Sequence, residues 1–110
     1  MAVVTALITS GQSLSAAADL AALQLNAIAI PAAWDNADLT FQVSPDAGVT
    51  FYDFFFGGQF TELVLPVQAG KIYSVAWIVW PKNIQIKARS GRIGITVNQT
   101  ANRTISFLTA

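Results

Sequence analysis

Residues 39–44 read LTFQVS and decide the fold class. Leu39, Phe41 and Val43 fall on one side of an extended chain, and the residues between them are Thr, Gln and Ser. This period-two alternation predicts a β-strand with one face on a core and the other toward solvent. The same alternation recurs in residues 84–89, 93–97 and 104–107. The chain therefore carries a repeated pattern of half-buried strands.

Further apolar or aromatic runs at residues 3–9, 23–30 and 51–56 are typical of strands, and short turn sequences separate them. SPDAG at residues 44–48 and SGR at residues 90–92 are two such turns. About eight strands at this spacing predict an all-β protein, an antiparallel β-sandwich of the jelly-roll type, with one domain over residues 1–110. Residues 14–25 fit either a loop or one helical turn that leads into a strand.

The charged fraction is 11%, and the hydrophobic fraction is 54%. An ordinary soluble domain has about 25% charged residues, which keep its surface hydrated. Two explanations remain: the exposed faces are neutral Thr, Ser, Gln and Asn, or other subunits cover much of the surface. We expect both.

Several chemistries are excluded by residue type. The chain has no Cys and no His, which removes disulfides, zinc sites and the usual catalytic triads. We therefore expect no enzyme activity, no cofactor and no metal. Two weaker alternatives remain, a catalytic carboxylate pair and a Ca²⁺ ion held by Asp46 and Asp53 with backbone carbonyls. The pair would come from Asp35, Asp38, Asp46 or Asp53, although Asp35 and Asp46 are typical turn residues.

Neither a membrane nor a nucleic acid is an expected partner. The longest apolar window, residues 16–34, is interrupted by Asp19, Gln24, Asn26 and Pro31. The six basic residues are dispersed and form no basic stripe. All six acidic residues precede all six basic ones in the chain. A dipolar molecule could result, but we expect the sandwich strands to interleave the two halves and mix the charges.

The aromatic residues indicate where a partner could bind. Consecutive side chains of a strand point to opposite faces, so at least one of Phe54, Phe55 and Phe56 must leave the core. A neighbouring subunit, a local loop or a ligand could cover it. We predict a subunit interface, and its candidate residues are Val3, Leu7, Phe54, Phe55, Phe56, Trp77 and Trp80. A glycan-stacking platform built from Trp34 and Trp80, with Trp77, is the alternative.

The order of several motifs resembles small structural proteins of tailed-phage virions, including head-decoration and head-spike-base proteins. The matching stretches are residues 28–34, 37–44, 46–51, 86–91 and 98–105. Residues 34–51 also resemble the discoidin or galactose-binding-like jelly roll, although Asp46 and Gly48 are separated where that fold has an Asp-Gly turn. Sugar-binding members often use loop His residues, which this chain lacks. The resemblance therefore favours the fold and a virion role over a sugar site.

This resemblance implies a capsid cement or decoration protein, or the base of a head spike or fibre, located in the bacteriophage head. Its partners would be the major capsid protein or other virion subunits, and it would form a homo-oligomer, a trimer or a pentamer. Two alternatives stay open: a carbohydrate-binding module that attaches to host glycans, and a tail or baseplate subunit.

Overall fold

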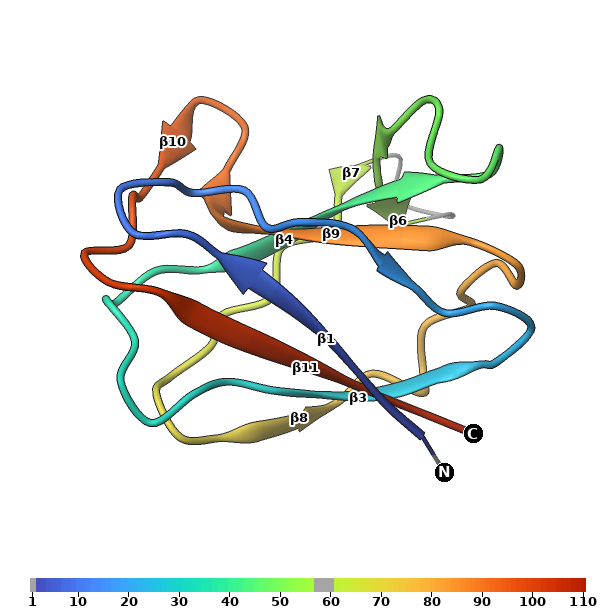
Figure 1. The fold of residues 1–110 in the computed structure, drawn as a ribbon, viewed down its shortest axis with the longest axis horizontal. Helices are drawn as coiled ribbons and strands as arrows, with labels where there is room; N and C mark the ends of the chain where they lie inside the picture. Colours follow the sequence, from blue (N-terminus) through green and yellow to red (C-terminus); the bar gives the residue numbers. More distant parts are fainter. Residues whose placement is uncertain (1, 57–60) are drawn as a thin grey trace.

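The computed structural model describes residues 2–56 and 61–110, with Phe56 described through its backbone only. This part of the chain is all-β, as predicted, and its strands pair antiparallel (Figure 1). The strands are β1 (Ala2–Ile8), β2 (Ala18–Asp19), β3 (Leu25–Ala29), β4 (Leu39–Ser44), β5 (Tyr52–Asp53), β6 (Phe55–Phe56), β7 (Thr61–Glu62), β8 (Ile72–Ser74), β9 (Gln85–Arg92), β10 (Ile95–Thr96) and β11 (Arg103–Thr109).

Two sheets form the sandwich. The first has the order β1-β11-β3-β8, and the second has the order β10-β9-β4-β5 with β2 beside β9. Strands β6 and β7 pair as a separate two-stranded hairpin. Ala2 pairs with Thr109, so the first and last strands lie side by side (Figure 1). Residues far apart in sequence therefore share one sheet.

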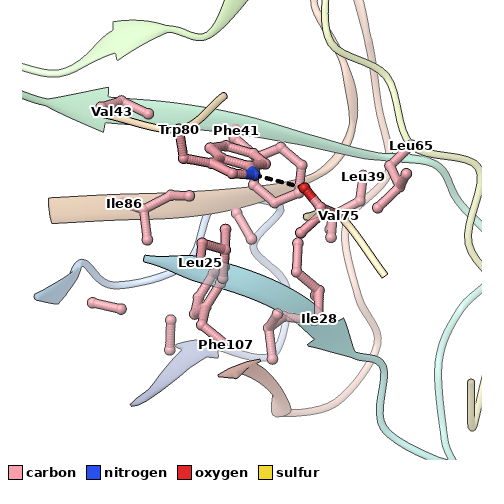
Figure 2. Close-up of a cluster of buried hydrophobic side chains, with 14 of the residues drawn as sticks. Leu25, Ile28, Leu39, Phe41, Val43, Leu65, Val75, Trp80, Ile86 and Phe107 are labelled. Atoms are coloured by element: carbon pink, nitrogen blue, oxygen red, sulfur yellow. Dashed lines mark hydrogen bonds between the residues drawn. The ribbon is translucent and has the colours of Figure 1, made fainter. Parts of the chain in front are cut away.

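The core lies between the two sheets and follows the predicted alternation. Leu39 and Phe41 of β4 are fully buried, as is Phe107 of β11 from the opposite sheet (Figure 2). Ile105 of β11 is fully buried as well. Each such side chain contributes roughly 1.5–3 kcal/mol through removal of its apolar surface from water. Residues 14–25, which sequence left undecided, form a bridge, the short strand β2 and a turn.

Trp80 lies inside this core, which corrects its prediction as an interface and glycan-stacking residue. Only 3% of its surface is exposed. Its ring stacks on Phe54 at 4.7 Å and meets Phe41 edge-on at 5.5 Å. Its indole Nε1 donates a hydrogen bond of 3.1 Å to the Val75 carbonyl oxygen (Figure 2). The apolar run at residues 75–80 turns instead of extending, and this turn points Trp80 inward while leaving Trp77 outside.

Two further expectations from alternation were wrong. Thr40 and Ser44 were expected on a solvent face, but both are fully buried. The loop after β4 folds over Ser44, and Thr40 lies opposite Arg89, whose guanidinium binds Glu62 of β7. Ile93 and Ile95 were expected inward, but they lie in a short hairpin and are 52% and 59% exposed.

The charges mix across the two halves of the sequence, as expected. In the described part of the chain, three ion pairs each join an earlier acidic residue to a later basic one. The pairs are Arg89–Asp53 at 2.8 Å, Arg89–Glu62 at 3.3 Å and Arg103–Asp35 at 2.9 Å. The fold therefore brings acidic residues of the first part of the sequence next to basic residues of the second part.

Candidate interaction surface

The outer face of the first sheet carries no charged side chain. Inward residues of β1, β11, β3 and β8 alternate with outward ones, and the pairing register aligns the outward positions in rows. We call these ten outward residues the uncharged face. They are Val3, Thr5, Leu7, Ala27, Ala29, Ile72, Ser74, Thr104, Ser106 and Leu108.

The side chains of the uncharged face are short, and several are apolar and exposed. Val3 is 59% exposed, Leu7 is 40% exposed and Ile72 is 67% exposed. Strand spacing and rise give the four-stranded face an area of roughly 400 Å². Ala, Ser, Thr and Val lose little conformational entropy when a partner covers them. A contiguous neutral area of this kind is typical of protein contact sites.

The structure places the other predicted interface residues apart from this face. Phe54 is half-buried against Trp80, while Phe55 is 50% exposed on the β6–β7 hairpin. The side chain of Phe56 lies outside the described part of the chain. Trp77 is 62% exposed, and its indole Nε1 donates a hydrogen bond of 3.2 Å to the carbonyl oxygen of Ser74. Val3 and Leu7 alone of the predicted set therefore lie on the uncharged face.

The sequence interpretation missed the other half of this face. Thr104 and Ser106 were correctly expected to point outward, but nothing in the sequence placed them beside Val3 and Leu7. Strand β8 has only three residues, too few for an alternating pattern to be recognised, so the outward position of Ile72 could not be predicted. Ala27 and Ala29 lay in a predicted strand whose neighbours were unknown.

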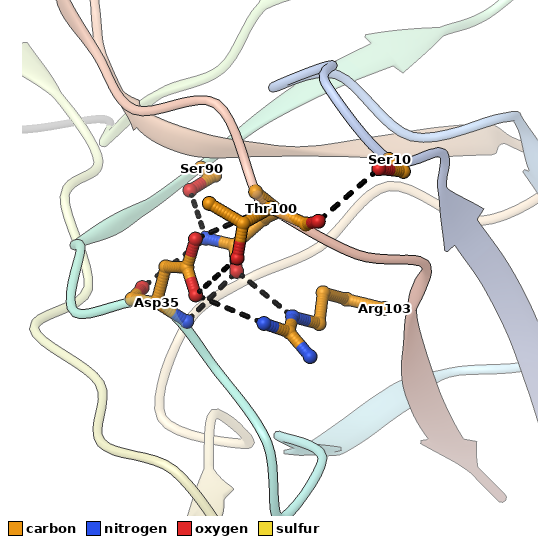
Figure 3. Close-up of polar contacts among 6 residues, drawn as sticks. Ser10, Asp35, Ser90, Thr100 and Arg103 are labelled. Atoms are coloured by element: carbon orange, nitrogen blue, oxygen red, sulfur yellow. Dashed lines mark hydrogen bonds and ion pairs between the residues drawn. The ribbon is translucent and has the colours of Figure 1, made fainter.

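Asp35 belongs to a polar network that joins two loops at one end of the sandwich (Figure 3). Its carboxylate accepts hydrogen bonds from the Thr100 backbone N–H at 2.8 Å and the Thr100 hydroxyl at 3.1 Å, and it pairs with Arg103 at 2.9 Å. The bonds from Thr100, then the charge of Arg103, lower the pKa of Asp35 below its ordinary value. A carboxylate held in this way serves as a loop anchor.

Asp46 anchors its own turn in the same manner. It accepts the Thr50 N–H at 2.9 Å and the Ser44 hydroxyl at 2.7 Å, and these two bonds lower its pKa. Asp53 instead pairs with Arg89. Across residues 2–56 and 61–110, no group of three or more acidic, His or Cys side chains comes together in a way that could hold a metal ion.

Two open cavities lie at the loop ends of the sandwich. One, of about 220 Å³, lies between residues 36–38 and the β9–β10 hairpin, and the other, of about 430 Å³, lies between residues 45–47 and 83–85. Among the described residues, no aromatic side chain lines either cavity. Trp34 is half-buried against the core, and its indole Nε1 donates to the Ala37 carbonyl oxygen at 3.3 Å. Of the two tryptophans of the predicted glycan platform, Trp80 is therefore buried and Trp34 is half-buried.

Comparisons of the chain with protein-family models, with curated proteins and with solved structures found no match. In the described part of the chain, no helix has the length and hydrophobicity that a membrane span requires. The uncharged face is thus the feature from which a function can be argued.

Proposed function

We propose that this chain is a structural subunit of a bacteriophage particle that acts by protein–protein contact and not by catalysis. It would serve on the head as a cement or decoration protein, or as the base of a head spike or fibre. The uncharged face is the observation that supports a contact role, because it presents exposed Val, Leu and Ile without one ionic side chain. The motif resemblance described above supports the virion setting.

The size of the face bears on how such a subunit would bind. At ~25 cal/mol per Å² of apolar surface, burial of roughly 400 Å² on each partner, about half of it apolar, yields on the order of 10 kcal/mol. Association costs about 4–15 kcal/mol in lost translational and rotational freedom. One face against one partner is therefore marginal. Stable attachment to the major capsid protein or to other virion subunits requires several contacts per assembly, which a homo-oligomer supplies through avidity.

The absence of charge predicts how the contact responds to salt. Ionic interfaces weaken as ionic strength rises, because mobile ions screen the charges. Burial of the uncharged face involves no ionic attraction that salt could screen. The chain should therefore stay bound to particles washed in concentrated sodium chloride. Release by salt alone would indicate an ionic interface and contradict this contact.

Substitution of Ala29 tests the face directly. Ala29 lies between Ser106 and Ile72 in the pairing register, so Ala29→Lys places an ammonium near the middle of the face. The matched control is Thr96→Lys, at an exposed position of β10 in the other sheet. We expect purified phage particles to retain Thr96→Lys and to lose Ala29→Lys, with both variants folded by circular dichroism. Equal retention would contradict the proposed contact.

The other two functions are separated by simple measurements. A tail or baseplate subunit would co-purify with tails and not with heads. Because Trp80 is buried, the carbohydrate-binding alternative depends on the exposed Trp77 and the half-buried Trp34. We expect no glycan binding on an array, and binding that Trp77→Ala abolishes would favour that alternative.

A further inference from the structure

Strand β1 is an edge strand, and its outer edge is open over part of its length. One hydrogen bond fixes the direction in which the backbone groups of β1 point. The Ala16 N–H donates to the Leu7 carbonyl oxygen at 2.9 Å, on the side of β1 away from β11. Because backbone groups alternate along a strand, those of Val3 and Thr5 point to the same open side. No hydrogen bond to them on that side occurs among the described residues.

This edge lacks the features that usually prevent pairing with another chain. Natural edge strands are protected by charged side chains, Pro, bulges or very short length. β1 is seven residues long, reads AVVTALI and pairs in unbroken register with β11. Val4, which points inward, is only partly buried against the core. A strand added here would satisfy the free backbone groups and complete the cover of Val4.

We infer that β1 pairs antiparallel with β1 of a second copy of this chain across a two-fold axis at Val4. In this register Val3 of one copy lies opposite Thr5 of the other, and the two residues exchange two N–H···O=C bonds. The two-fold axis repeats this pair on its other side. We call the contact between the two β1 strands the β1 seam. Val4 then faces Val4 of the second copy in the non-hydrogen-bonded position. Four hydrogen bonds use all the open backbone groups of Val3 and Thr5 in both copies.

The opposite edge of the sheet explains why the second copy uses β1. In a head-to-tail ring, β1 would pair with β8 of the next copy. The Ser74 carbonyl oxygen, however, already accepts the Trp77 indole N–H at 3.2 Å, and β8 has only three residues. β8 therefore offers fewer bonds than β1 offers to itself. This pairing predicts a two-fold dimer, whereas the motif resemblance implied a trimer or a pentamer.

Neutrality makes the pairing self-complementary. A two-fold interface brings the same surface of two copies together, so a surface with an excess of one charge would repel its copy. β1 carries no charged residue. The two uncharged faces then join into one continuous sheet surface of roughly 800 Å², the size that one partner contributes to a standard interface. This inference rests on the proposed function in that both place subunit contacts on the first sheet.

Cysteine cross-linking tests the seam and its register, since the chain has no Cys of its own. Facing residues of a non-hydrogen-bonded pair have Cα atoms ~4.5 Å apart, within the range of a disulfide. Val4→Cys should therefore oxidise readily to a covalent dimer. Thr5→Cys should not, because two copies of residue 5 lie beyond the ~7 Å limit. Cross-linking of Thr5→Cys in preference to Val4→Cys would overturn this register.

Proline variants test the same seam without oxidation. Thr5→Pro removes an N–H that makes no bond to β11, so the fold should persist. Each dimer loses two hydrogen bonds, and the dimer dissociation constant should rise about 30-fold in sedimentation. Ile72→Pro removes the equivalent outward N–H of β8 and should leave the dimer unchanged. A wild-type chain that stays monomeric, or a larger effect of Ile72→Pro, would overturn the inference.

The outcomes also separate this inference from the proposed function. If the chain is found in particles but Thr5→Pro has no effect on its association, the virion role stands and the β1 seam is wrong. If the dimer forms as described but the chain is missing from particles, the seam stands and the virion role is wrong.

Discussion

Gln99 illustrates how this fold buries polar groups between its loops. Its side chain is fully buried. Its amide oxygen accepts the Asp35 N–H at 2.8 Å and the Arg103 Nε–H at 3.3 Å, and its amide nitrogen donates to the Asp35 carbonyl and the Ser90 hydroxyl. An amide has two donor hydrogens and two main acceptor positions, and all are used. The network holds residue 35 and residues 99–103 in one arrangement.

Gln99→Leu should lower the free energy of unfolding by about 1–3 kcal/mol, because four hydrogen bonds to Asp35, Ser90 and Arg103 are lost in a network that water reaches only in part. Urea denaturation measures this change. Gln68 has an exposed side chain, so Gln68→Leu should stay within about 0.5 kcal/mol of wild type. Equal effects of the two variants would show that the network is not structural.

The lowered pKa of Asp35 predicts acid sensitivity. A carboxyl group whose folded pKa lies below its unfolded value stabilises the fold above the unfolded pKa, and this contribution disappears as pH falls through the folded pKa. We expect stability to drop as the pH falls below about 4, the ordinary pKa of an aspartate carboxyl. Asp35→Asn has no carboxyl proton to bind, so its urea midpoint should change less with pH over this window. An unchanged pH dependence would contradict the role of the Thr100 and Arg103 bonds.

At the level of elements, alternation identified which residues of β4, β9 and β11 face the core. It could not predict what covers the other face, because the cover comes from distant segments. Thr40 and Ser44 are buried by a hairpin and a turn that sequence alone did not position. Ile93 and Ile95 followed the alternating pattern, yet a tight turn at Gly94 keeps their strand short and exposed. Period-two patterns therefore predict strand faces, and tertiary packing decides burial.

Thr40 offers a test at this scale. Its hydroxyl is buried and has no hydrogen-bond partner among the described residues. Thr40→Val keeps the side-chain shape and removes the desolvated hydroxyl, so the free energy of unfolding should rise by about 1 kcal/mol. Ser44→Ala should do the opposite, because the Ser44 hydroxyl donates to Asp46 and accepts the Gly48 N–H. Thermal and urea unfolding measure both. A loss of stability in Thr40→Val would indicate a bond in the native state.

For the whole molecule, the low charged fraction indicated that part of the surface would be neutral. The order of strands in the first sheet determines which residues form that neutral surface. The uncharged face combines strands from both ends of the chain, with Val3 opposite Leu108 in the register. Val3 and Leu7 could be predicted from the sequence because they lie in one apolar run. Ala29 and Ile72 could not, since no local sequence pattern indicates the order of strands in a sheet.

The copy number of this chain in purified phage particles tests the central claim most directly. If the proposed role holds, a phage genome encodes the chain, and quantitative mass spectrometry of that phage's particles would measure the chain against the major capsid protein. The proposed role predicts a fixed, symmetry-related number of copies that survives concentrated salt. Particles that contain none of this chain would contradict it.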